Sequence, residues 1–125
     1  MTTSSLTAQE EKKFAEQTII QFVKGTSARD SYNLSYILHE DFHALISEND
    51  LATVSKSEYM KMLSWKNLGG EEQEVEILSL DMAINTASVK VKIKRTNNSF
   101  EAYYHLLMEA NGSWQILHVI PFRTI

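Results

Sequence analysis

The chain has 125 residues, 12 basic and 16 acidic side chains, a formal net charge of −4 and no cysteine. A chain of this length is expected to form one domain, residues 1–125, whose core needs no disulfide. The acidic balance disfavours nucleic acid as a partner, because phosphate binding depends on clustered basic side chains. Residues 1–6 lack the features of a secretion signal, and no apolar run is long enough to cross a membrane. We therefore expect a cytoplasmic domain without a membrane partner.

Two helices are predicted at the start of the chain. Thr7 and Glu10 form a capping-box pattern, and the apolar residues that follow recur at helical spacing. Gly25 is expected to end this helix, because glycine accepts the left-handed conformation found at helix C-termini. Asp30 is expected to cap a second, shorter helix.

A hairpin and a third helix are predicted next. Residues 41–47 and 51–54 have the composition of two short strands with a polar turn between them. Ser55 and Glu58 form a second capping box, which opens a helix expected to run to about Trp65.

Long strands dominate the rest of the chain. Residues 75–80 change phase, which predicts a bulge or a bend, whereas residues 87–94 alternate between apolar and mostly lysine side chains. A turn is predicted at residues 97–98. Asn111 and Gly112 separate two apolar runs and predict a hairpin with a type I′ turn, in which both central residues have positive φ. The element order predicts an α+β fold with a curved sheet wrapped around helices.

The final strand is apolar on both faces. By strict alternation, one face carries Trp114, Ile116, His118, Ile120 and Phe122. The other face carries Leu117, Val119 and Pro121. Helices cover only one face of such a sheet, so the second apolar face needs another cover. We predict a homodimer formed through the open face of the C-terminal strands.

Four segments carry a resemblance to a known fold family. They are residues 28–30 after the first helix, residues 37–42 at the step into the first strand, residues 54–59 at the third helix and residues 111–117 at the final hairpin. In this order they resemble the nuclear transport factor 2-like superfamily, and more specifically its polyketide cyclase (SnoaL-like) and "putative lumazine-binding" branches. The resemblance implies a cystatin-like cone: a mixed, mostly antiparallel sheet around the N-terminal helices, with a pocket at its wide end and homodimers through the convex face.

Ketosteroid isomerisation is the best-understood reaction of this superfamily and uses an aspartate base with two oxyanion donors. The resemblance places the corresponding positions at Phe22, near Ile46 and near Tyr104. Two of these roles are vacant and the third residue has changed type, so this mechanism is not expected here.

Four histidines, His39, His43, His105 and His118, invite a metal site, and a histidine is also the natural acid–base group near neutral pH. His39 and His43 have the spacing of a helical zinc pair, but they fall at a helix–strand boundary where two rings do not share a face, so no metal is expected. The resemblance places the first strand beside the last, which brings His43 towards His118. Asp41 or Glu40 is the candidate partner of such a histidine. The alternative is a half-buried histidine bonded to backbone or water.

A ligand pocket is expected between the first helix and the concave face of the sheet. Its predicted lining residues are Phe22, Tyr36, Trp65, Tyr104 and Phe122. The alternative is that aromatic residues at these spacings simply form the core.

Three functions remain open at this point. The first is a homodimeric small-molecule-binding protein, and the second is a lyase, isomerase or hydrolase acting through His43 or His118 with Asp41. The third is a dimerisation module with a filled core. The sequence contains no glycine-rich phosphate loop, no nucleophile elbow and no CxxC motif, so no cofactor is expected.

Overall fold

The computed structural model describes residues 8–47, 51–66, 69–96 and 98–122. Its elements are, in order, α1 (Ala8–Ala28), α2 (Ser31–Ile37), β1 (Leu38–Ser47), β2 (Leu51–Ser55), α3 (Lys56–Ser64), β3 (Glu74–Ala83), β4 (Thr86–Lys94), β5 (Ser99–Met108) and β6 (Trp114–Phe122). This order confirms the predicted α+β class. No described helix is long and apolar enough to cross a membrane.

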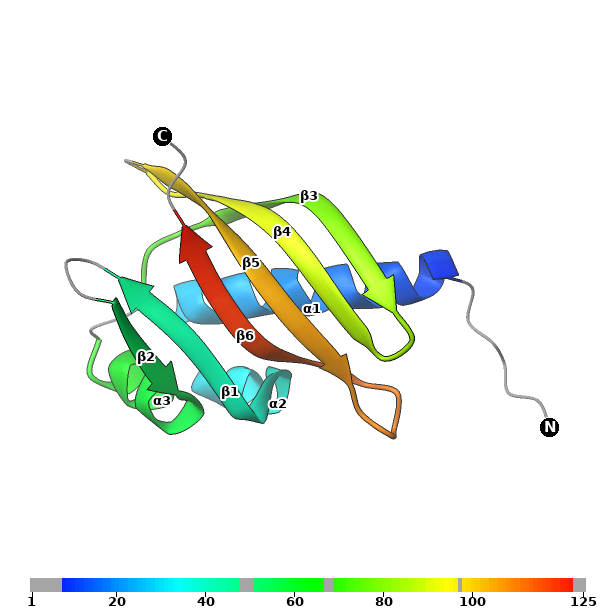
Figure 1. Cartoon of the computed structure of the whole chain (residues 1–125). Helices are drawn as coiled ribbons and strands as arrows, with labels where there is room; N and C mark the ends of the chain where they lie inside the picture. The colour runs from blue at the N-terminus through cyan, green and yellow to red at the C-terminus, as the bar shows by residue number, and fades with distance from the viewer. Residues whose placement is uncertain (1–7, 48–50, 67–68, 97, 123–125) are drawn as a thin grey trace.

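The strands form one sheet in the order β2-β1-β6-β5-β4-β3. Strands β1 and β6 run parallel, whereas the other neighbouring pairs are antiparallel. Figure 1 shows the sheet curving across α1, with the helices on one side only. This is the predicted mixed, mostly antiparallel cone. We call the side that faces the helices the inner face, and the opposite side the outer face.

Helix α1 continues beyond Gly25 to Ala28, so the predicted stop at Gly25 is wrong. Arg29 takes the left-handed conformation instead, with a φ of 53°. The N–H groups of Arg29 and Asp30 donate to the carbonyls of Thr26 (3.1 Å) and Gly25 (2.8 Å), which is the bonding pattern of a Schellman cap. Gly25 serves packing, because a Cβ there would lie 2.9 Å from Cδ2 of Leu34 on α2. The glycine therefore lets α1 and α2 approach closely.

The caps of α2 and α3 are those that the sequence predicts. Asp30 accepts a hydrogen bond from the backbone N–H of Asn33. Ser55 and Glu58 form a complete capping box at the start of α3. The ammonium group of Lys56 then donates to the carbonyls of Ser35 (2.7 Å) and Leu38 (3.0 Å). It thereby joins the start of α3 to the end of α2. The predicted cap at Thr7 lies outside the described residues.

The β5–β6 turn is not of type I′. Among its residues only Gly112 has a positive φ, of 88°. The N–H of Glu109 donates to the carbonyl of Ser113 (2.8 Å), and the N–H of Gly112 donates to that of Glu109 (2.9 Å). The side-chain oxygen of Asn111 instead accepts hydrogen bonds from the backbone N–H and the hydroxyl of Ser113. This pattern is that of a three-residue loop ending in a left-handed glycine.

Strand β3 contains the predicted bulge, because its register with β4 shifts between Ile77 and Ser79. The turn predicted between the first two strands, residues 48–50, lies outside the described residues. So does Asn97 of the predicted 97–98 turn.

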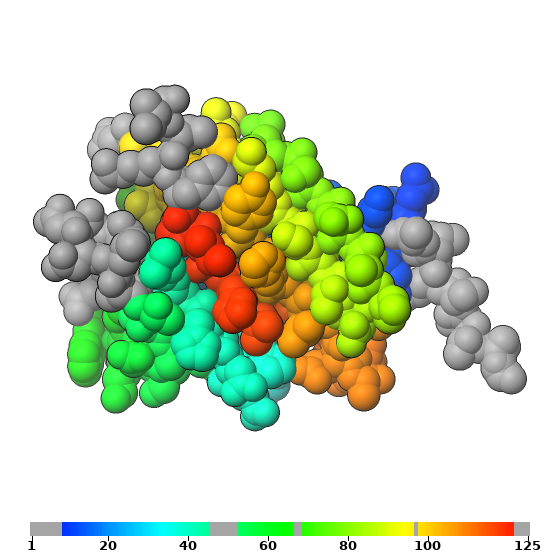
Figure 2. All heavy atoms as spheres, viewed as in Figure 1, coloured from blue at the N-terminus to red at the C-terminus, as the bar shows by residue number. Residues whose placement is uncertain are grey.

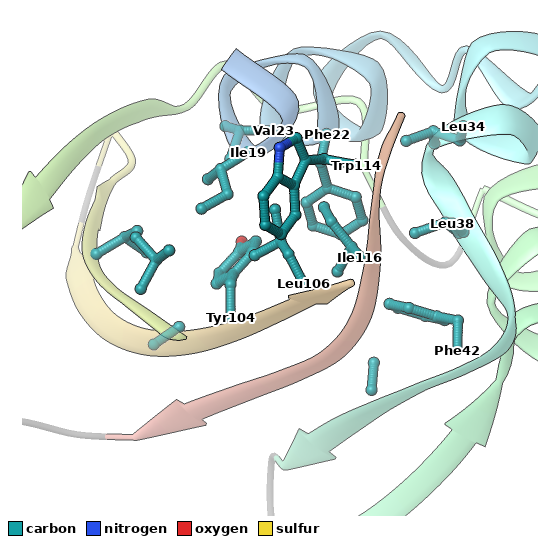
Figure 3. Packing of buried hydrophobic residues seen from close by; sticks show 14 of the residues in the cluster. Ile19, Phe22, Val23, Leu34, Leu38, Phe42, Tyr104, Leu106, Trp114 and Ile116 are labelled. Carbon is teal, nitrogen blue, oxygen red and sulfur yellow. The ribbon is translucent and has the colours of Figure 1, made fainter. Parts of the chain in front are cut away.

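The space inside the cone is packed with side chains. Figure 3 shows Ile19, Phe22 and Val23 of α1 lying against side chains from the strands. The ring of Phe22 meets that of Tyr104 edge to face at 5.5 Å between centroids. Trp114 is also buried, and its indole N–H donates to a carboxylate oxygen of Glu11 (3.2 Å), which ties β6 to α1.

Candidate functional site

The outer face of the sheet carries a row of polar side chains that crosses five strands. His43 on β1 pairs with His118 on β6, and His118 pairs with His105 on β5. His105 pairs with Ser88 on β4, which pairs with Asp81 on β3. Residues directly opposite each other point to the same side of a sheet. The five side chains therefore form one line, and we call its three imidazoles the histidine row.

The imidazoles of the histidine row are close neighbours. The ring centroids of His43 and His118 are 6.3 Å apart, and those of His118 and His105 are 5.8 Å apart. The predicted proximity of His43 and His118 is thus confirmed. Their catalytic role stays a prediction.

His43 is oriented by the backbone rather than by a carboxylate. Its Nδ1 lies 2.7 Å from the carbonyl oxygen of Asp41. A carbonyl only accepts hydrogen bonds, so Nδ1 carries the proton and the lone pair of a neutral ring is on Nε2. The Asp41 carboxylate, one of the two expected partners beside Glu40, instead lies 4.0 Å from Nδ1 of His39.

His118 sits at the centre of the histidine row. Partial burial lowers its pKa below the usual value of 6.5, and the charges of His105 and His43 lower it further. A neutral imidazole at physiological pH can accept a proton and donate another.

A bulge in β6 places His118 on the outer face. The register with β5 shifts so that Leu106 pairs with Ile116 while His105 pairs with His118, which leaves Leu117 as the extra residue. The strict alternation predicted for this strand is therefore wrong. Trp114 and Ile116 face inward, whereas His118 and Ile120 face outward.

Beside this bulge the outer face is hollowed. A half-open pocket of about 300 Å³ lies over β3, β4, β5 and β6. Its polar lining residues include Asp81, Ser88, His105 and His118, and its apolar ones include Leu107 and Leu117. We call this pocket the outer hollow.

The remainder of the outer face carries two exposed apolar residues, Tyr103 and Ile120, and ion pairs beside them. We call these two residues the apolar strip. Tyr103 and Ile120 pair across β5 and β6, and their side chains are 40% and 38% exposed. Lys90 approaches Glu101 at 3.5 Å on the neighbouring strands. Figure 2 shows that strands form this surface and that α1 emerges only beyond the end of the sheet. No described helix covers it.

The structure does not bring together the four predicted ligand residues whose side chains it describes, Phe22, Tyr36, Trp65 and Tyr104. Phe22 and Tyr104 are buried against each other in the core. Tyr36 and Trp65 are 64% and 66% exposed, at the end of α2 and after α3. The side chain of Phe122 lies outside the described part of the chain. A pocket walled jointly by the described members of this set is not formed, and the role of each in ligand binding stays a prediction.

Tyr36 lines a different pocket, between α1 and α2. This groove has a volume of about 610 Å³. Its lining residues are Gln21, Lys24, Gly25, Ala28, Asp30, Asn33, Tyr36 and Ile37. The ring of Tyr36 meets that of Tyr32 edge to face at 5.3 Å. We call this pocket the helical groove.

The inner face holds one buried polar contact near the end of α1. The hydroxyls of Thr26 and Tyr59 are 2.9 Å apart. Burial raises the pKa of Tyr59 to about 12, against the opposing effect of the Thr26 hydrogen bond. Burial also raises the pKa of Tyr104. Both phenols therefore stay protonated at neutral pH.

The sequence interpretation did not identify His105, Ser88 or Asp81 as site residues. Ser88 could have been found, because it shares the outward parity of the lysines on β4. His105 could not, because its pairing with His118 depends on the β6 bulge.

His39 and His43, which have the sequence spacing of a helical zinc pair, contact different partners in the structure. Nε2 of His39 lies 3.1 Å from a carboxylate oxygen of Glu109, whereas His43 belongs to the histidine row. Among the described residues, no group of three or more His, Cys, Asp or Glu side chains is arranged to hold a metal ion.

The fold closely matches several solved structures. An NTF-2-like protein of unknown function from Silicibacter pomeroyi has a TM-score of 0.81 at 18% identity, over 94% of this chain and 98% of that one. An NTF2-like protein of unknown function from Shewanella baltica has a TM-score of 0.77 at 15% identity, over 94% and 97%. A structure described as a "Putative Scytalone Dehydratase" from Novosphingobium aromaticivorans has a TM-score of 0.66 at 16% identity, over 92% and 85%. At these identities the likeness shows the fold alone.

The sequence itself matches one protein family. No curated protein matches at a significant level. The family profile described as "Putative lumazine-binding" matches residues 10–120, which is most of the chain. The chain therefore belongs to this family, within the nuclear transport factor 2-like superfamily.

Proposed function

We propose that the protein binds a small molecule in the outer hollow and acts as a homodimer through the outer face. The observation that carries the first part is the lining of the hollow. The lining combines imidazole, hydroxyl and carboxylate groups with leucine side chains. Ligand sites usually combine apolar walls with a few convergent polar groups, at volumes from about 300 Å³ upward.

The polar groups of the hollow suit a planar heterocycle with several donors and acceptors. Asp81 accepts hydrogen bonds, and Ser88 and neutral His118 both accept and donate. The description of the family supports a ligand of the lumazine type. Lumazine is therefore the first probe.

Pocket-filling variants test this site against the helical groove. Ala83→Phe places a ring in the outer hollow, and Ala28→Phe places one in the helical groove. Both positions are exposed, so both variants are expected to fold. We expect Ala83→Phe to weaken lumazine binding at least tenfold in a fluorescence titration and Ala28→Phe to leave it unchanged. The reverse pattern would move the site to the helical groove, and no binding by the wild type would exclude lumazine.

The homodimer is supported by the composition of the outer face. Tyr103 and Ile120 lie on the two central strands of the outer face, which no described helix covers. On its flank, Lys90 and Lys94 lie near Glu101 and Glu76, so both signs of charge are present for a two-fold interface. We expect sedimentation velocity at micromolar concentration to give twice the chain mass of 14.3 kDa. A sedimenting mass equal to one chain would contradict the dimer.

A second candidate function is catalysis by the histidine row. The favouring observation is that His118 is held neutral between two other imidazoles, while His43 is fixed with its Nε2 lone pair free of the Asp41 contact. A lyase, isomerase or hydrolase needs such a base. Mass spectrometry of a bound ligand before and after incubation tests this. Conversion that His118→Gln abolishes supports the enzyme, and an unchanged ligand supports a binding protein.

A further inference from the structure

The histidine row lies where a dimer through the outer face would bury it. Strand β6 has β1 on one side and β5 on the other, so His118 is well inside the sheet rather than at an edge. Ile120, two residues along, belongs to the apolar strip. Any partner that covers this strip also covers His118.

The charged groups around the row differ from one end to the other. His43 lies near Glu58 of α3. Hydrogen bonds from Ser55 lower the pKa of Glu58, and the charge of His43 lowers it further. At the other end, Asp81 lies beyond Ser88.

The centre of the row is different. The direct cross-strand neighbours of His118 are both histidines. The nearest ion pair on β4 and β5, Lys90 with Glu101, is internally compensated. A proton on His118 therefore meets like charge on both sides whenever its neighbours are protonated, and it has only partial access to water.

We propose that the histidine row makes the dimer sensitive to acid, so that protonation of its imidazoles separates the two copies of the chain. This inference rests on the proposed dimer. When the outer hollow holds no ligand, a two-fold interface through the outer face would cover the histidine row of each copy, and the loss of water there disfavours charged imidazoles.

The sign of the effect follows from linkage. Burial in the interface lowers the pKa of His118 further than in the single chain, so the separated chains bind more protons than the dimer. Dimer affinity is therefore complete above the pKa of His118 in the separated chain, which burial already places below 6.5, and it falls as the pH drops through that pKa. Because a dimer holds two copies of His118, its dissociation constant rises by up to about 100-fold per pH unit from this residue alone.

Sedimentation velocity of the full chain between about pH 8 and about pH 5 tests the proposal. We expect the wild type to be dimeric at the upper limit and to dissociate towards the lower one, with circular dichroism unchanged. His118→Gln should remain dimeric throughout or dissociate at clearly lower pH. His39→Gln is the matched control, because His39 bonds to Glu109 outside the row and should keep the wild-type pH dependence. EDTA is included, so that metal bridging between imidazoles is tested separately.

The possible outcomes test the proposed dimer and its proposed sensitivity to acid separately. A wild type that is monomeric at every pH overturns both the dimer and the acid response. A dimer whose dissociation constant does not change with pH, or changes equally in wild type and His118→Gln, overturns the acid response and leaves the dimer standing. Dissociation caused by EDTA at the upper pH would assign the row to metal bridging instead and overturn the proposal.

Discussion

The two faces of this sheet are built from the same strands and have opposite properties. On β5, Tyr104 and Leu106 turn inward and are buried, while Tyr103 and His105 turn outward. The inner face is filled by α1 and by the aromatic cluster around Phe22. The outer face keeps the histidine row, the apolar strip and the outer hollow. Phe22 and Tyr104, two of the aromatic residues that suggest a pocket, are thus buried in the core, whereas the imidazoles of the histidine row lie on the opposite side.

The largest expected effect contrasts the two tryptophans of the chain. Trp114→Ala removes a buried ring and its bond to Glu11, and it should lower the free energy of unfolding by about 3–5 kcal/mol. Trp65→Ala removes an exposed ring and should change it by about 0.5 kcal/mol or less. Urea unfolding followed by circular dichroism measures both. Similar losses would mean that Trp65 has a buried role that the structure does not give it.

The glycines provide the second contrast. Both Gly69 and Gly112 have positive φ, which costs a non-glycine residue about 1–2 kcal/mol. A Cβ at Gly69 would also overlap the carbonyl oxygen of Thr26, whereas one at Gly112 meets nothing within 4 Å. Gly69→Val should therefore lower the thermal midpoint more than Gly112→Val. The opposite ranking would show that the loop at Gly69 moves away from α1.

Alkaline pH should destabilise the inner face. The pKa of Tyr59 is about 12 in the folded chain and close to 10 when unfolded, so its contribution is complete below pH 10. It is lost as the pH rises towards 12, by about 1.4 kcal/mol per pH unit. Tyr59→Phe should cost about 1 kcal/mol at neutral pH by breaking the Thr26 contact, and it should reduce the alkaline loss to the part that buried Tyr104 contributes. An unchanged alkaline slope in this variant would contradict a buried, protonated phenol. The same titration of Tyr103→Phe is the control, because this tyrosine lies on the outer face.

The smallest expected effect is stabilising. Ile84, in the turn between β3 and β4, is 95% exposed and has a φ of 52°. A β-branched side chain is strained in this conformation, and asparagine tolerates it better. Ile84→Asn should raise the free energy of unfolding by about 1 kcal/mol, measured by urea unfolding. A loss of stability instead would mean that Ile84 contacts something in solution, and a concentration dependence of that loss would point to the second copy.

Local signals in the sequence were reliable where one or two neighbouring residues decide the structure. The cap at Asp30, the capping box at Ser55 and the bulge in β3 follow from side-chain chemistry and phase within a few residues. The end of α1 could not be predicted in this way, because Gly25 packs closely against Leu34 and does not form the turn that ends the helix. That contact joins two helices and leaves no local pattern.

The candidate site was only partly predictable for the same reason. The proximity of His43 and His118 came from the family resemblance, which supplied the strand order. The bulge at Leu117 decides which face His118 occupies, and nothing in the alternating apolar run of β6 marks it. Tyr36 and Trp65 were expected in a pocket because a sheet curved around helices leaves a concave space, but in the structure both side chains are mostly exposed, on α2 and just after α3.

The central claim is that the outer face is the working surface of the molecule. Its most direct test is the sedimenting mass of Ile120→Asp at about pH 8, because this change puts a charge into the middle of the apolar strip and leaves the inner core intact. Gln21→Asp adds the same charge on the exposed side of α1 and serves as the control. We expect Ile120→Asp to sediment as one chain of 14.3 kDa with native circular dichroism, and Gln21→Asp and the wild type to sediment at twice that mass. A dimeric Ile120→Asp, or a wild type that sediments as a single chain, would contradict the claim.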